Sequence, residues 1–258
     1  MKTFRLVFMI LIMSGLIFQG RAHVCWDDLE FKQFSTPEGL PNSMVHQVYQ
    51  DRDGYIWIPT FYGLFRYDGY EVRTYKSNLY TPGLLVNNNV LCVEEDYSHR
   101  LWIGTHEGLC MLDKRTGKMK KLQLDGVSKQ RLNEIHVTKE NRVYLGYIRG
   151  MAYYDEMQDT LALMTRKNCR GDVPESVNIQ TLFEDVNGDL LIGTWKDGLY
   201  RYCIKENTFL HYPPLDEENS VLALFQDSRG VMWIGTSGSG LYLSLIHISE
   251  PTRPEPIS

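Results

Sequence analysis

The fold follows from residues 96–113, which read Asp96-Tyr-Ser-His-Arg-Leu-Trp102-Ile-Gly104-Thr105-His-Glu-Gly108-Leu109-Cys-Met-Leu-Asp113. Near-copies of this stretch recur along almost the whole chain, together with one degenerate copy. Their equivalent positions are Trp57, Trp102, Tyr144, Leu191 and Trp233, which are spaced by 45, 42, 47 and 42 residues. Such a spacing is the length of a four-stranded propeller blade. The sequence therefore predicts an all-β chain in which five blades of a β-propeller are visible.

Each repeat divides into four strands separated by recognisable turns. Apolar residues of the first strand, such as Val45 and Val48, lie three positions apart and so on opposite faces, which predicts burial on both faces between adjacent blades. An Asp-x-x-Gly turn follows, in which Asp caps the turn and Gly takes a positive φ. The second strand carries Trp-Ile-Gly-Thr, and the recurrence of its tryptophan indicates packing between blades rather than ligand stacking. The third strand begins with Gly-Leu, and a short fourth strand ends the blade.

The chain divides into three segments. Lys2 and Arg5 precede an apolar run that ends at Phe18, which predicts a secretory signal at residues 1–22, with an uncleaved anchor as the alternative. Residues 23–242 are expected to form part of a propeller that senses a ligand. Residues 243–258 depart from the blade pattern and resemble the translation of a sequencing adapter, so we interpret them as a non-native tail.

The composition limits the function classes. With 32 acidic and 27 basic residues, the net charge of −5 supplies no field for a phosphate backbone, so no direct nucleic-acid binding is expected. The basic cluster Lys114–Lys121 is interpreted as a solvated turn. The five cysteines show no metal-ligand spacing, and the turn that begins at Asp51 resembles a calcium loop but has Tyr62 where a bidentate Glu is needed. No metal, cofactor or catalytic residue is therefore predicted.

The candidate ligand site lies in the loops after the second strands. These loops differ between blades and share one face of the propeller with the variable inter-blade connections, which is where a rigid scaffold usually carries binding. Aromatic rings beside polar groups suit a sugar, whose C–H faces stack while its hydroxyls need partners. The candidate ligand-binding residues are Phe61, Tyr62, His106, Arg149 and Trp195.

The motif from Leu40-Pro-Asn-Ser43 through Gln50-Asp51 and Ile56-Trp57-Ile to Gly63-Leu-Phe-Arg-Tyr67-Asp68-Gly69 resembles the two-component regulator propeller repeat. The resemblance runs from about Phe31 to Tyr242 and departs from the pattern at Pro59 and around Tyr144. It implies part of a seven-bladed ring in the periplasmic sensor region of an inner-membrane hybrid histidine kinase, which forms a homodimer at full length. It also implies detection of an oligosaccharide and phosphorelay signalling to glycan-utilisation genes through kinase, receiver and DNA-binding domains that this sequence lacks.

Two other functions stay open at this point. One is an exported propeller enzyme acting on carbohydrate, for which Glu94-Glu95-Asp96 and Glu184-Asp185 offer acidic groups. Their recurrence at the end of first strands favours turn capping and solvation instead. The other is a protein-interaction scaffold without a small ligand. The full-length gene would discriminate between them, because a downstream membrane span and kinase core supports the sensor.

Overall fold

The structure is a computed structural model that describes residues 44–77, 85–124, 129–214 and 219–243. All strands belong to one compact unit, Ser35–Ser258, and form five sheets in sequence order, which we number as blades 1 to 5. The signal predicted at residues 1–22 lies outside the described residues, and so does the predicted tail except for Leu243. The described residues contain no helix that is long and apolar enough to cross a membrane.

Blades 1 to 3 are four-stranded antiparallel sheets with consecutive strands side by side. Blade 1 comprises β1 (Tyr49–Gln50), β2 (Ile56–Thr60), β3 (Gly63–Tyr67) and β4 (Val72–Tyr75). Blade 2 comprises β5 (Val90–Glu95), β6 (Arg100–Thr105), β7 (Gly108–Asp113) and β8 (Met119–Leu122). Blade 3 comprises β9 (Leu132–Val137), β10 (Val143–Tyr147), β11 (Gly150–Asp155) and β12 (Thr160–Leu163).

Blades 4 and 5 depart from four strands. Blade 4 comprises β14 (Ile179–Glu184), β15 (Leu190–Thr194), β16 (Leu199–Cys203) and β17 (Thr208–Tyr212), and β13 (Arg170–Gly171) adds a fifth strand parallel to β17. The described part of blade 5 has three strands, β18 (Val221–Gln226), β19 (Met232–Thr236) and β20 (Leu241–Leu243). The predicted five-blade β-propeller architecture is confirmed.

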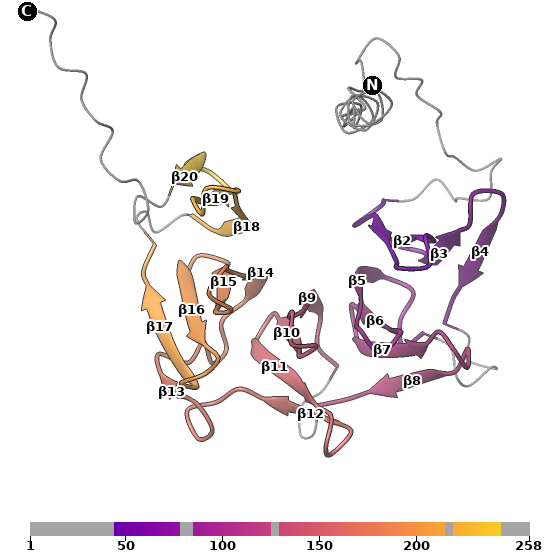
Figure 1. Cartoon of the computed structure of the whole chain (residues 1–258), viewed down its shortest axis with the longest axis horizontal. Helices are drawn as coiled ribbons and strands as arrows, with labels where there is room; N and C mark the ends of the chain where they lie inside the picture. Colours follow the sequence, from indigo (N-terminus) through magenta and orange to yellow (C-terminus); the bar gives the residue numbers. More distant parts are fainter. Residues whose placement is uncertain (1–43, 78–84, 125–128, 215–218, 244–258) are drawn as a thin grey trace, which may run out of the picture. The chain divides into compact units, whose positions relative to one another are not determined.

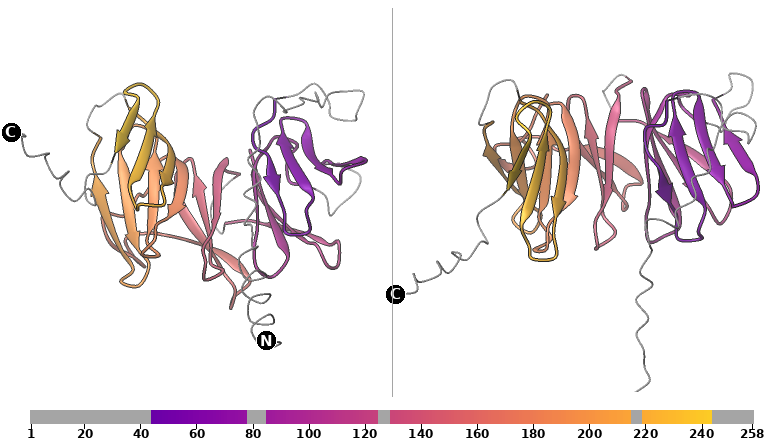
Figure 2. Two further views of the ribbon diagram at one scale, coloured as in Figure 1. Left: turned by 45° about the horizontal axis from the view of Figure 1, so that its top comes forward. Right: turned by 90° about the horizontal axis from the view of Figure 1, so that it is seen from above.

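Neighbouring blades contact one another through their first strands. Strand β9 lies between β5 and β14, and β14 in turn lies beside β18 (Figure 1). Figure 2 shows the sheets standing side by side with their strands running in the same general direction. This arrangement buries apolar side chains between neighbouring blades, where Trp57 and Trp102 are at most 1% exposed. The predicted inter-blade role of these two tryptophans is confirmed.

The Asp-x-x-Gly turn also holds the tryptophan that follows it. In blade 1, Asp51 Oδ1 accepts hydrogen bonds from the backbone N–H groups of Asp53 and Tyr55, and Gly54 has φ +90°. The other carboxylate oxygen of Asp51 accepts the indole N–H of Trp57 at 2.8 Å. Asp96 holds Trp102 in the same way at 2.9 Å. Asp and Trp six residues apart are therefore one structural unit that joins a turn to the packing between blades.

Two predictions about the blades are wrong. The first strands are not buried on both faces throughout, because Val48 is 67% and Phe225 is 61% exposed. Within the described residues, the blades that carry them have a neighbouring blade on one side only. Lys114 is not in a solvated turn, because its side chain is buried against Asp51, Asp53 and Glu95 at 2.6 to 2.9 Å.

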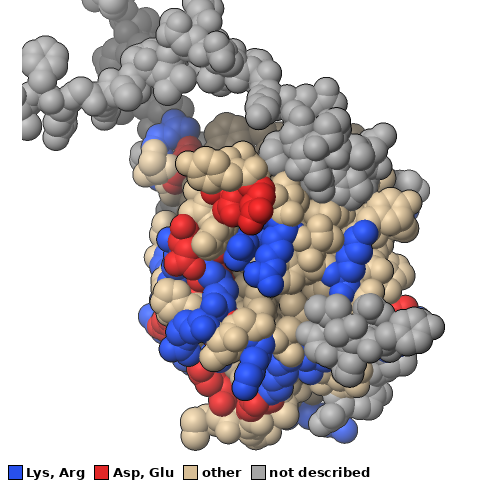
Figure 3. Space-filling model, turned by 90° about the vertical axis from the view of Figure 1, so that its right-hand side faces the viewer, with Lys and Arg blue, Asp and Glu red and all other residues tan. Residues whose placement is uncertain are grey.

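Figure 3 views the side of the molecule on which β4 lies in Figure 1, and it shows Lys and Arg side chains with acidic groups beside them. Within the cluster Lys114–Lys121, Lys120 of β8 pairs with Asp159 of the next blade at 2.5 Å. Both Lys114 and Lys120 of blade 2 therefore form ion pairs with a neighbouring blade.

Candidate functional site

The predicted ligand-binding residues lie at the same end of four consecutive blades. Phe61 and Tyr62 lie between β2 and β3, where they are about half exposed and their rings meet edge to face at 5.3 Å. The other three are exposed between the second and third strands of blades 2, 3 and 4, namely His106, Arg149 and Trp195. The structure thus brings them to one end of the sheets, and their joint action on a ligand stays a prediction.

A repeated threonine shapes the turns that carry these residues. The hydroxyls of Thr60, Thr105 and Thr194 donate to the carbonyl oxygens of Gly63, Gly108 and Gly198 at 2.7 to 2.9 Å. These hydrogen bonds close each turn, so the residues between threonine and glycine project from the end of the blade. The threonine of Trp-Ile-Gly-Thr recurs in the sequence, and that recurrence was the signal for its structural role.

Three of the acidic groups named above as candidates for an enzyme, Glu95, Asp96 and Glu184, make contacts that hold the blades. Glu95 accepts the backbone N–H of Arg52 from blade 1 at 2.8 Å, and Glu184 accepts that of Lys139 from blade 3 at the same distance. Asp96 caps its turn, as predicted. The prediction of solvation is wrong for Glu95 and Asp96, which are at most 2% exposed. In the described part of the chain, no three His, Cys, Asp or Glu side chains are grouped so that they could hold a metal ion.

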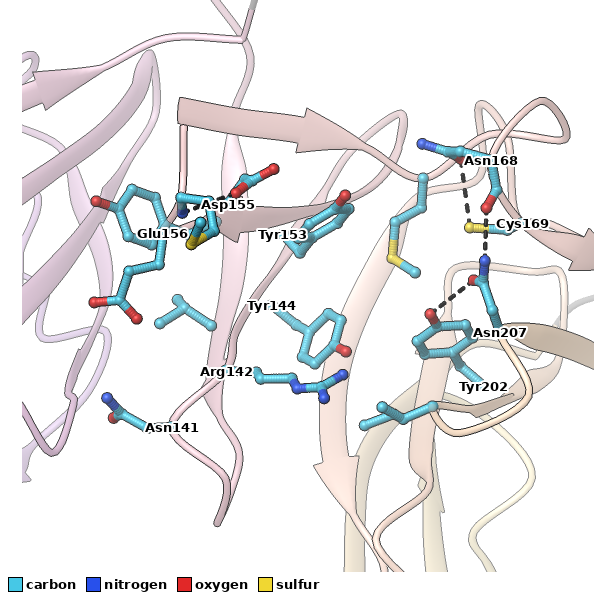
Figure 4. Close-up of a pocket in the computed structure, with 15 residues that line it drawn as sticks. Asn141, Arg142, Tyr144, Tyr153, Asp155, Glu156, Asn168, Cys169, Tyr202 and Asn207 are labelled. Carbon is cyan, nitrogen blue, oxygen red and sulfur yellow. Dashed lines mark hydrogen bonds between the residues drawn. The ribbon is translucent and has the colours of Figure 1, made fainter. Parts of the chain in front are cut away.

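A pocket that sequence reasoning missed lies at the opposite end, between blades 3 and 4 (Figure 4). Its volume is about 550 Å³. Its walls come from the turn after β9, from β11 and the turn after it, and from the end of β16 with the turn that follows. Four tyrosines dominate the lining, together with amides, Arg142 and two acidic residues, namely Tyr144, Tyr153, Tyr154, Tyr202, Asn141, Asn168, Asn207, Asp155 and Glu156.

The blade 4 wall of this pocket is held by a short chain of contacts. The Tyr202 hydroxyl donates to Asn207 Oδ1 at 2.9 Å, and the Asn207 amide donates to the backbone carbonyl of Asn168 at 2.6 Å. The ring of Tyr202 stacks on Phe209 with centroids 4.4 Å apart and meets the edge of Tyr144 at 6.0 Å. Figure 4 shows Tyr144 and Tyr202 next to each other in the lining of the pocket.

Both facing tyrosines stay protonated at neutral pH. Burial raises the pKa of Tyr144, although the hydrogen bond from Arg142 opposes the shift. Burial also raises the pKa of Tyr202. The pocket therefore offers neutral rings and hydroxyl donors rather than phenolate charge.

The cysteines contribute no cross-link among the described residues. Cys92, Cys110, Cys169 and Cys203 are all unpaired there, and Cys25 lies outside the described residues. Cys92 and Cys110 are buried within strands, as predicted, and burial raises the pKa of each thiol. Both therefore act as small apolar core residues.

Comparison with known proteins supports the repeat family. The family described as two component regulator propeller matches residues 39–58, 84–107 and 216–238, which fall in blades 1, 2 and 5. Histidine kinase P4 of Formosa agariphila is 32% identical over 72 residues, which are 28% of this chain and 5% of the kinase. The chain therefore spans a small part of that relative.

Solved structures share the fold. The extracellular domain of BT4673 from B. thetaiotaomicron, described as part of a hybrid two-component system, has a TM-score of 0.53 and 21% identity, covering 82% of this chain and 32% of that one. PorZ of the type-IX secretion system of Porphyromonas gingivalis has a TM-score of 0.60 and 15% identity, covering 78% and 32%. Virginiamycin B lyase of Staphylococcus aureus has a TM-score of 0.64 and 12% identity, covering 81% and 68%.

These similarities have different weights. The structural likenesses rest on low identity and include a lyase, so they establish the β-propeller fold and leave the function open. The sequence matches fall on the repeated blade motif itself. The chain therefore contains three segments that are similar to the two component regulator propeller repeat, on a β-propeller fold.

Proposed function

We propose that this chain is the extracytoplasmic ligand-sensing propeller of a hybrid two-component histidine kinase, and that its ligand is an oligosaccharide. The matching repeat family, the kinase relative and the extracellular domain of similar fold support the sensor role. In this proposal the chain is exported to the periplasm and signals through the remainder of a homodimeric kinase. No catalytic step is assigned to the propeller.

One observation carries the assignment of a ligand site. Phe61, Tyr62 and Trp195 expose about half of their surface at one end of the blades, on turns that threonine hydrogen bonds hold rigid. Exposed aromatic side chains on rigid turns bind flat apolar surfaces without a large cost in conformational entropy. The C–H face of a sugar ring is such a surface, and His106 and Arg149 supply polar groups for its hydroxyls.

The test is binding of neutral tetrasaccharides of glucose, xylose and mannose to the chain, measured by calorimetry. For the tetrasaccharide that binds, Trp195→Ala is expected to weaken the affinity roughly tenfold, because the stacking surface is lost. Tyr70→Ala is the matched control, since Tyr70 is exposed in the turn after β3, at the other end of blade 1. Equal affinities of the wild type and Trp195→Ala would refute this site.

A further inference from the structure

The pocket between blades 3 and 4 exists because a cluster that fills the preceding blade interface is incomplete here. Between blades 2 and 3, the guanidinium of Arg100 lies 5.4 Å from the ring centroid of Trp102 and 5.3 Å from that of Tyr154. Asp96 holds it at 2.5 Å and Glu156 at 3.1 Å, and the side chain is only 14% exposed. We call this group, Arg100 with its two carboxylates, the arginine clamp.

The equivalent positions between blades 3 and 4 retain the arginine and lose both acids. Arg142 corresponds to Arg100, and the strand register places Tyr144 and Tyr202 where Trp102 and Tyr154 stand. Thr138 replaces Asp96, and Ile204 replaces Glu156. Among the described residues, Arg142 has an ion pair only with Glu140, at 3.4 Å, and its side chain is 57% exposed.

The acidic side chains of the pocket do not supply the missing carboxylate. Asp155 accepts the backbone N–H groups of Met157 and Gln158 in its own turn. Glu156 pairs with Arg100 across the other face of blade 3. Arg142 therefore reaches the pocket as a cation without a buried counter-charge, next to the hydroxyl of Tyr144 (Figure 4).

We propose that this pocket binds a small organic acid, whose carboxylate pairs with Arg142 and whose ring lies against Tyr144, Tyr202 and Met164. The ligand carboxylate would take the place that Asp96 and Glu156 occupy around Arg100. An arginine is well suited to this role, because its planar guanidinium binds a carboxylate through two parallel hydrogen bonds. The volume of about 550 Å³ accommodates a ligand of one or two rings.

The pocket is expected to prefer negatively charged ligands over neutral ones, and this preference does not depend on the proposed oligosaccharide site. Calorimetry on the chain at neutral pH would use benzoate and glucuronate as probes, with benzamide and glucose as their neutral counterparts. At least one of the two acids is expected to bind, and its affinity is expected to be at least tenfold higher than that of its neutral counterpart. Binding of benzoate alone would identify a flat aromatic acid, and binding of glucuronate alone would identify a sugar acid.

Variants locate the binding in this pocket. Arg142→Gln is expected to weaken the acid roughly tenfold to a hundredfold, since a charge-assisted pair is lost. Thr138→Asp is expected to weaken it as well, because an internal carboxylate then competes for Arg142. Arg115→Gln is the matched control, since Arg115 is 69% exposed in the turn after β7 and away from the pocket. Trp195→Ala is also expected to leave acid binding unchanged, which separates this site from the proposed sugar site.

Three results would overturn the proposal. The first is the absence of binding by both acids up to about 10 mM. The second is equal binding of an acid and its neutral counterpart. The third is an unchanged affinity in Arg142→Gln, with circular dichroism confirming that the variant is folded. Loss of tetrasaccharide binding in Trp195→Ala bears on the proposed function alone.

Discussion

The interface between blades 2 and 3 and the interface between blades 3 and 4 use the same strand positions and differ in how those positions are filled. The first is closed by the arginine clamp, with Trp102 fully buried. The second has Thr138 and Tyr144 at the matching positions and contains the pocket. Different side chains at equivalent strand positions therefore distinguish the packed interface from the one that contains the pocket.

The interface between blades 1 and 2 shows a third solution. There the cation is Lys114 of blade 2, and the acids are Asp51 and Asp53 of blade 1 with Glu95 of blade 2. The cation Lys114 comes from the later of the two blades, whereas the cation Arg100 comes from the earlier blade of its interface. In both interfaces a buried cation lies among carboxylates. Two of these three interfaces hold a buried cation paired with carboxylates, whereas at the interface between blades 3 and 4 the cation Arg142 is more than half exposed.

The largest effect is expected from removal of the acid in the arginine clamp. Asp96→Ala leaves the guanidinium of Arg100 and the indole N–H of Trp102 without their shared acceptor and removes the cap of the turn. The expected loss is about 3 kcal/mol or more in the free energy of unfolding, measured by urea denaturation. Thr138→Ala is the matched change in blade 3, where one hydrogen bond to the backbone N–H of Arg142 is lost, so about 1 kcal/mol is expected. Equal losses would show that the two turns have the same role.

A smaller loss is expected from Lys114→Met, because the stem of the side chain is kept while three carboxylates lose their cation. The expected loss at neutral pH is about 2 kcal/mol in the free energy of unfolding. Burial by itself lowers the pKa of Lys114, but hydrogen bonds to Asp51 and Asp53 outweigh it, so the lysine stays charged.

This second prediction has a defined dependence on pH. The hydrogen bond from Lys114 lowers the pKa of Asp53 below its ordinary value of 3.8 in the folded chain. A carboxyl with a lowered folded pKa stabilises the fold above its unfolded pKa, and that contribution is lost as the pH falls through the folded pKa. Urea midpoints of the wild type and Lys114→Met are therefore expected to converge as the pH falls below about 4. A difference that is constant from pH 7 to pH 3 would contradict an ionic role for Lys114.

The smallest expected effect is a gain in stability when an acid is introduced at the interface between blades 3 and 4. Thr138→Asp places a carboxylate where Asp96 stands, so it can cap the turn and pair with Arg142. Because Arg142 is more than half exposed, the expected gain is about 1 kcal/mol in the free energy of unfolding. The gain should vanish in the double variant Thr138→Asp with Arg142→Gln. A gain that survives in the double variant would assign it to the turn cap alone.

The comparison also explains which parts of the site were predictable. Trp102 and Asp96 recur at fixed spacing, so their architectural roles were visible, and the turn residues Phe61 and Trp195 were placed correctly at the ends of strands. The pocket was not predicted, because its lining is not a motif. Its one sequence signal was the departure around Tyr144, where the tryptophan and the turn aspartate are both replaced.

By itself, the sequence determined the repeat, the blade count and the strand order, since these depend on local turns and on periodic burial that recur every 42 to 47 residues. Only the tertiary structure decided which charged side chains are buried and with which partners they pair. Lys114 looked like part of a solvated turn, but it lies beside Asp51 of the preceding blade. Burial of a charge depends on partners about one blade away in the chain, and which side chains meet there is settled only when two blades pack together.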